Sequence, residues 1–137
     1  MFLGQAQNNV VKWSAELVHK GADEYEVVIE AEIESNWFLY SQNLGEGGPI
    51  PTTIDFTVND SFSLVGETEE LDENSVEKMD DMFAMKLKKY KNKATFVQQI
   101  KSSEDLNSVK GSIEFMTCDD TKCLPPTFVD FKAMLKE

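Results

Sequence analysis

The sequence has no arginine, one histidine, two cysteines, and no apolar run near the ~20 residues that a bilayer span requires. Its thirteen basic residues are all lysines and face twenty-five aspartates and glutamates, so the net charge at pH 7 is −12. A surface of this sign repels nucleic-acid phosphates and anionic lipid headgroups. We therefore expect no nucleic-acid partner and no membrane insertion by this chain.

The scarcity of histidine and cysteine also restricts the chemistry. His19 would have to be the centre of any Ser-His-Asp arrangement, and we expect it to be an ordinary surface residue of a strand. Two cysteines and one histidine barely provide the ligands of a zinc site, and their spacing does not suggest one. The glycines at 45–48 precede Pro49 rather than a helix, so they do not form a phosphate-binding loop. We expect no cofactor and no metal.

The residues that are present have the composition of one folded domain. A chain of 137 residues, 41% hydrophobic and 28% charged, can bury a core without metal or multiple disulfides. Residues 1–9 fit a trimmed secretory signal, a cloning remnant or a plain tail, so we exclude them from the fold. The expected domain is residues 10–137.

Apolar and polar residues alternate along much of the chain, which is typical of half-buried strands. Short polar or glycine-rich breaks separate the alternating runs, and eight or nine strands are expected. The clearest runs lie at 11–17, 25–33, 54–58, 113–116 and 129–135. This pattern predicts an all-β protein, an immunoglobulin-like antiparallel β-sandwich, with a closed barrel as the main rival.

The segment between residues 71 and 90 is the hardest to assign. Its first part is acidic and its second part is rich in methionine, and Asp80 and Asp81 interrupt any helical apolar stripe. We predict a loop at 71–81 and a strand at 82–90.

Cys118 and Cys123 are the strongest candidates for chemistry, in the segment CDDTKC. A tight connection would bring their sulfurs within bonding distance, and closing a loop of about six residues stabilises a fold by only about 2 kcal/mol. Three interpretations stay open: a structural bridge, a redox pair, or two free buried thiols. Asp119 and Asp120 disfavour a thiolate and Lys122 favours it, which suits a thiol that reacts inside a docked complex.

Four pieces of the sequence carry a family pattern when they are taken together. They are WFLYSQ at 37–42, GGPIPT at 47–52, DDMF at 80–83 with YKNKATF at 90–96, and CDDTKCLPP at 118–126. Together they resemble the N-terminal periplasmic domain of the thiol:disulfide interchange protein DsbD, a family also called disulfide bond corrector. The resemblance spans about residues 10–135, nearly the whole chain.

The resemblance implies an immunoglobulin-like sandwich in which Cys118 and Cys123 form a reversible disulfide at one end. Cys123 would then bond to partners, and Cys118 would resolve the mixed disulfide. A cap loop of Asp81, Met82 and Phe83 would cover the sulfurs. Asp81 matches an acidic cap position, whereas Met82 stands where the family has a second acidic residue.

The resemblance also implies a route for electrons. They would pass from a thioredoxin-like and membrane reductase module through the cysteine pair to oxidised periplasmic proteins, in a protein-disulfide reductase pathway. The chain would be periplasmic, with thioredoxin-like domains and periplasmic disulfide acceptors as partners. Phe38 and Tyr40 match aromatic positions near the family's active site, although such residues are usually core. The alternative function is a secreted β-sandwich that binds proteins and whose disulfide is purely structural.

Overall fold

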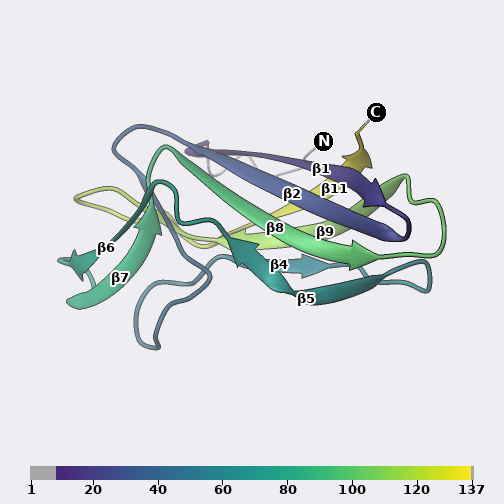
Figure 1. Cartoon of the computed structure of the whole chain (residues 1–137). Helices are drawn as coiled ribbons and strands as arrows, with labels where there is room; N and C mark the ends of the chain where they lie inside the picture. Colours follow the sequence, from purple (N-terminus) through teal and green to yellow (C-terminus); the bar gives the residue numbers. More distant parts are fainter. Residues whose placement is uncertain (1–8, 137) are drawn as a thin grey trace.

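A computed structural model describes residues 9–136, so almost all of the predicted tail at 1–9 lies outside the described residues. Within 9–136 the chain forms strands and no helix, and the strands make two sheets that share an apolar core (Figure 1). This part of the chain accordingly contains no helix able to span a membrane. The predicted all-β class is confirmed.

Eleven strands follow one another in the described residues, whereas eight or nine were expected. The shortest strands and the most polar strands were not predicted, because they show no apolar alternation. The bounds of the eleven strands are β1 (Val11–Gly21), β2 (Glu24–Ile33), β3 (Phe38–Tyr40), β4 (Thr53–Phe56), β5 (Ser63–Glu70), β6 (Ser75–Asp80), β7 (Met85–Tyr90), β8 (Lys93–Lys101), β9 (Ser108–Phe115), β10 (Thr117–Cys118) and β11 (Thr127–Leu135).

The larger sheet has seven strands in the order β4-β9-β11-β1-β2-β8-β5, and the smaller sheet has four in the order β10-β3-β7-β6. Neighbouring strands are antiparallel except β1 and β11, which pair in parallel. The larger sheet ends at β4 and β5, which do not pair with each other, so it is open rather than a closed barrel. The fold is the predicted immunoglobulin-like sandwich.

The core follows the period-two alternation of the sequence. In β2 every second side chain is buried, and these residues are Tyr25, Val27, Ile29, Ala31 and Ile33. Strands β1, β8, β9 and β11 add their own buried faces to the same apolar cluster, which also includes Leu39 and Tyr90 of the smaller sheet. Removing this shared face from water holds the two sheets together.

The predicted loop at 71–81 and strand at 82–90 are wrong in their boundaries. The structure has a strand, β6, inside the predicted loop, then a turn at 81–84, and β7 begins only at Met85. β6 lies at the edge of the smaller sheet, and only Asp80 of its six residues is buried. An edge strand of this kind needs no apolar face, so its sequence shows no alternation.

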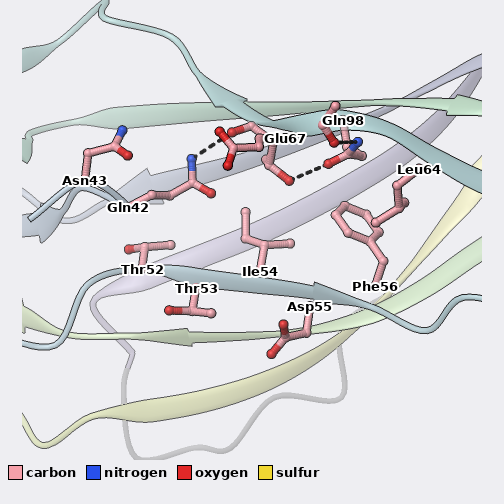
Figure 2. A pocket seen from close by; sticks show the side chains of 12 residues that line it. Gln42, Asn43, Thr52, Thr53, Ile54, Asp55, Phe56, Leu64, Glu67 and Gln98 are labelled. Atoms are coloured by element: carbon pink, nitrogen blue, oxygen red, sulfur yellow. Dashed lines mark hydrogen bonds between the residues drawn. The ribbon is translucent and has the colours of Figure 1, made fainter.

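The two end strands of the larger sheet leave a pocket of about 460 Å³ between them. Ile54 and Phe56 of β4 face Leu64 of β5 across it (Figure 2). Gln98 of β8 is buried there, and its side-chain amide bonds the Thr68 hydroxyl at 2.7 Å and three backbone carbonyls. None of the lining residues belongs to the cysteine segment or to the 81–84 turn, so this pocket is separate from the site that follows.

Candidate functional site

The two cysteines face each other across a short hairpin. Cys118 ends β10, where it lies opposite Phe38 of β3, and Cys123 returns alongside it in an antiparallel bridge. Their Cα atoms are 3.9 Å apart and their sulfurs form a disulfide bond. Two backbone hydrogen bonds, from Asp119 N–H to the Lys122 carbonyl (2.8 Å) and from Leu124 N–H to the Thr117 carbonyl (3.0 Å), close the hairpin.

Asp119 organises the turn between the cysteines. Its Oδ1 accepts the backbone N–H groups of Thr121 and Lys122, each at 2.8 Å, and the Thr121 hydroxyl at 3.1 Å. The hydrogen bond from the Thr121 N–H, followed by that from Lys122, lowers the pKa of the Asp119 carboxyl. This carboxylate is therefore part of the turn that brings the two sulfurs together.

The two sulfurs differ in their access to solvent. Cys118 is only 2% exposed and packs in a small cluster with Tyr40 and Leu87, whereas Cys123 is half-buried at the rim of that cluster. An incoming thiolate can attack only a sulfur that it reaches. Of the two cysteines, Cys123 is therefore the more accessible and Cys118 the more sheltered.

Two residues of the 81–84 turn lie near this disulfide. The Sδ of Met82 is 3.9 Å from the Sγ of Cys123. Phe83 packs in the same cluster as Cys118, and its ring meets the Tyr40 ring edge-on at 6.1 Å. The structure thus brings Met82 to the Cys123 sulfur and Phe83 to the cluster that contains Cys118, although both residues lie more than thirty positions before the cysteines in the sequence.

Asp81, the third residue predicted for the cap, has no contact with the cysteines among those described for Met82 and Phe83. Its side chain is exposed, and the buried carboxylate of this segment is that of the preceding residue, Asp80. The Oδ2 of Asp80 accepts hydrogen bonds from the Tyr40 hydroxyl (3.0 Å) and the Lys89 ammonium (3.1 Å). Its Oδ1 accepts from the Met82 N–H at 2.9 Å and from the next N–H of the turn at 3.3 Å.

Lys89 completes this network from β7. Its ammonium pairs with Asp80 and lies 4.4 Å from the centre of the Phe38 ring, in a cation–π contact. Burial raises the pKa of Asp80, but the hydrogen bonds from Lys89 and Tyr40 outweigh it and hold that pKa below its usual range. Burial, together with the Asp80 charge, raises the pKa of Tyr40, so its hydroxyl stays a donor at neutral pH.

Sequence reasoning missed Asp80 and Lys89 as site residues. The available signal was local, since an aspartate at the start of a turn often bonds the N–H two residues on. Asp80 and Asp81 fit that rule equally well in the sequence. Which of them points inward depends on the alternation along β6, a strand that the sequence did not predict.

A pocket of about 160 Å³ opens beside the network. It is lined by Phe38, Asp80 and Lys89 from the smaller sheet, by Met82 from the turn, and by Asp120 from the cysteine hairpin, among others. The cap, the buried ion pair and the hairpin therefore share one surface. The disulfide hairpin and the β6–β7 turn both lie toward the left end of the molecule in Figure 1.

Histidine contributes nothing to this site. His19 is exposed on β1, where its Nε2 lies 2.8 Å from the Ala22 carbonyl and its ring stacks on Tyr25 at 4.4 Å. In residues 9–136 no three side chains of histidine, cysteine, aspartate or glutamate are grouped so as to hold a metal ion.

Comparison with known proteins connects this geometry to a family. Residues 7–133 match the sequence profile of a family described as thiol:disulfide interchange protein DsbD, N-terminal. A search of curated proteins found no significant match.

Solved structures show the same fold at low sequence identity. The N-terminal periplasmic domain of ScsB from Proteus mirabilis superposes with a TM-score of 0.64 and 17% identity, over 96% of this chain and 48% of that one, so this chain spans about half of its length. The DsbD N-terminal domain of Neisseria meningitidis, in the reduced form, gives 0.55 and 15%, over 91% and 85%. A cohesin module from a Clostridium perfringens family 33 glycoside hydrolase gives 0.50 and 9%, over 95% and 99%.

Proposed function

Because this chain belongs to the family of DsbD N-terminal domains, a family of thiol–disulfide exchange domains with a cysteine pair, we propose that it relays electrons through a reversible Cys118–Cys123 disulfide. The donor is a thioredoxin-like or membrane reductase module, and the acceptors are oxidised periplasmic proteins. The domain acts in the periplasm as one component of a protein-disulfide reductase pathway. The family and the name of the ScsB relative, a periplasmic domain, support this assignment.

The difference in exposure between the two sulfurs carries the proposal. A donor thiolate attacks the Sγ of Cys123, the Cys118–Cys123 bond breaks, and Cys118 leaves as a thiolate that takes up a proton. The donor's second thiol then attacks its own sulfur in the mixed disulfide and releases the domain as a dithiol. Two electrons and two protons have passed to the domain, and the donor has become a disulfide.

Delivery to the acceptor runs through the same sulfur. The Cys123 thiolate attacks the acceptor disulfide and forms a mixed disulfide with it. Cys118 then attacks the Sγ of Cys123, which restores the internal disulfide and releases the reduced acceptor. Cys118 is well placed for this second step because its Cα is 3.9 Å from that of Cys123 and the cluster keeps it out of solvent.

The cap gives this exchange a form of selectivity. Met82 and Phe83 cover the disulfide with soft apolar groups, which hinder small thiols and adapt to an incoming protein surface. Asp81 stays the exposed acidic member of this cap and lines the small pocket beside it, whereas Asp80 occupies the buried position. Phe38 and Tyr40 then support the cap through Lys89 and Phe83.

Trapping of mixed disulfides tests the assignment of the cysteines. Cys118→Ala should leave Cys123 able to capture an oxidised thioredoxin-like partner as a stable mixed disulfide, visible as a thiol-sensitive adduct on a non-reducing gel. The matched variant Cys123→Ala should capture far less, since the remaining sulfur is 2% exposed. Equal trapping by both variants would contradict the assigned order.

Equilibration with graded thiol buffers tests the proposal as a whole. The oxidised protein should be reduced while it stays folded, at a potential within the range of exchangeable disulfides rather than below about −300 mV, where structural bonds lie. A bond that resists reduction in the folded state would instead favour the binding module with a structural disulfide.

A further inference from the structure

The carboxylate of Asp80 joins the cap turn to the smaller sheet. One of its oxygens holds the turn, through the backbone N–H groups of Met82 and Phe83. Its other oxygen holds the sheet, through the Tyr40 hydroxyl and the Lys89 ammonium. The side chain is 4% exposed, so water is poorly placed to replace these partners.

The turn needs such an anchor because its backbone is strained. Ala84, its last residue, has φ of 54°, a left-handed conformation that a residue with a Cβ adopts at a cost. The N–H of Ala84 bonds the backbone carbonyl of Asp80 at 2.7 Å, so the same residue closes both ends of the turn. A strained turn persists only where the surroundings determine its conformation.

Tyr40 couples the anchor to the cap side chains. Its hydroxyl donates to Asp80, while its ring makes an edge-to-face contact with the Phe83 ring and lies in one cluster with Cys118. A loss of the Asp80 carboxylate would therefore release both the backbone of the turn and the aromatic contact that seats it over the disulfide.

We propose that Asp80, with Lys89 and Tyr40 as its partners, is a positioning residue that keeps the cap turn closed over the disulfide and so controls how readily small thiols reach Cys123. The inference rests on the proposed function, since a cap matters only if the disulfide is exchanged. Asp80 acts through Met82 and Phe83, and it touches neither sulfur in the contacts described above.

The rate at which a small dithiol reduces the oxidised protein is the direct test. Asp80→Asn removes the charge and places an amide against the Lys89 ammonium, and the reduction rate should rise roughly tenfold as the open fraction grows. Glu77→Gln, an exposed change on the same strand with the same change in charge, should leave the rate within about twofold. A larger acceleration from Asp81→Asn than from Asp80→Asn would overturn the assignment.

A cycle with a stripped cap separates positioning from a general loss of stability. In a Met82→Ala/Phe83→Ala background the disulfide is already uncovered, so Asp80→Asn should add less than about twofold. An equal acceleration in both backgrounds, or none in either, would overturn the inference. Thermal unfolding of each variant confirms that the rates refer to folded protein.

Two further measurements keep the result decisive. If Asp80→Asn does not fold, Tyr40→Phe keeps the ring against Phe83 but loses the hydroxyl, and it should accelerate small-thiol reduction in the same direction by a smaller factor. Reduction of the wild-type protein by a thioredoxin-like reductase is measured in parallel. Its failure counts against the proposed function, whereas normal exchange with an Asp80-independent rate counts against this inference alone.

Discussion

The two sheets of the sandwich are stabilised in different ways. The seven-stranded sheet follows the alternation of its sequence and buries an apolar face, with Val27, Ile113 and Phe131 among its members. The four-stranded sheet has fewer and mostly shorter strands. It holds both of the buried charged residues found among residues 9–136, Asp80 and Lys89.

This difference shows where the fold can accommodate a reactive site. An apolar core tolerates neither a solvent-accessible sulfur nor a turn that opens, because each would expose surface whose burial stabilises the sheet. Buried polar contacts are directional, so a few of them hold a turn in place without a continuous apolar face. The disulfide and the 81–84 turn lie on the smaller sheet, whereas the larger sheet supplies most of the apolar core.

The largest effect should come from truncating the larger sheet. Phe131→Ala removes a buried ring that meets Phe56 edge-on at 5.6 Å, and it should lower the free energy of unfolding by about 3–5 kcal/mol. Phe128→Ala changes a 59% exposed ring on the same strand and should stay within about 0.5 kcal/mol. Urea denaturation of both oxidised proteins measures the contrast, and similar losses would contradict it.

Breaking the ion pair of the smaller sheet should cost less. Lys89→Met keeps the aliphatic stem over Phe38 but leaves the Asp80 carboxylate buried without its cation, which should cost about 3 kcal/mol. Lys93→Met removes an exposed ion pair with Glu30 and serves as the control, with no measurable loss expected. Equal stability of the Lys89 and Lys93 variants would show that the smaller sheet does not depend on its buried charges.

Removing the disulfide should have a still smaller effect. The bond closes a loop with a sequence separation of only five, so Cys118→Ala/Cys123→Ala should lose about 2 kcal/mol of unfolding free energy. Reduced wild-type protein should denature at the same urea concentration as this double variant, within error. A loss as large as that of Phe131→Ala would mark the disulfide as a main structural support and weaken the redox proposal.

Acid should affect stability through two carboxylates: Asp80 of the smaller sheet and Glu70, which ends β5 of the larger sheet and contacts β7 of the smaller one. Glu70 accepts hydrogen bonds from the Ser41 hydroxyl, the Gln42 N–H (2.8 Å) and the Tyr90 hydroxyl (3.1 Å), and it pairs with Lys88 at 3.2 Å. Although burial raises its pKa, these hydrogen bonds hold the pKa of Glu70 below its usual range.

The pKa of Asp80 is lowered in the same way, so both carboxylates stabilise the fold fully above their unfolded pKa of about 4. Stability should be flat from pH 7 to about 5 and should fall as the pH drops through the lowered folded values. Urea denaturation at pH 7, 5 and 3.5 measures this, and Glu70→Gln should show a shallower decline below pH 5. An unchanged slope would mean that other carboxyl groups control acid unfolding.

The accuracy of the sequence predictions differed between the two sheets for a physical reason. Strands with one buried face must alternate, so β1, β2, β4, β11 and the end of β9 were predictable from local pattern. Family resemblance predicted that the methionine and phenylalanine of the DDMF motif belong to a cap, and in the structure Met82 contacts the Cys123 sulfur while Phe83 packs against the cluster that contains Cys118. β6 was not predicted, because an edge strand with exposed side chains need not alternate. Without β6, the sequence did not indicate that Asp80 is the buried carboxylate.

By itself the sequence determined the all-β class, several strands of the larger sheet (β1, β2, β4, β11 and the end of β9), and the pair of sulfurs on which the chemistry depends. Each of these follows from local spacing, since alternation and a short cysteine loop act between near neighbours. Only the tertiary structure decided that Asp80 rather than Asp81 turns inward, that Lys89 pairs with it, and that Cys118 is the sheltered sulfur. A charged residue stays buried only where distant segments supply its partners, and a list of neighbours along the chain does not contain that information.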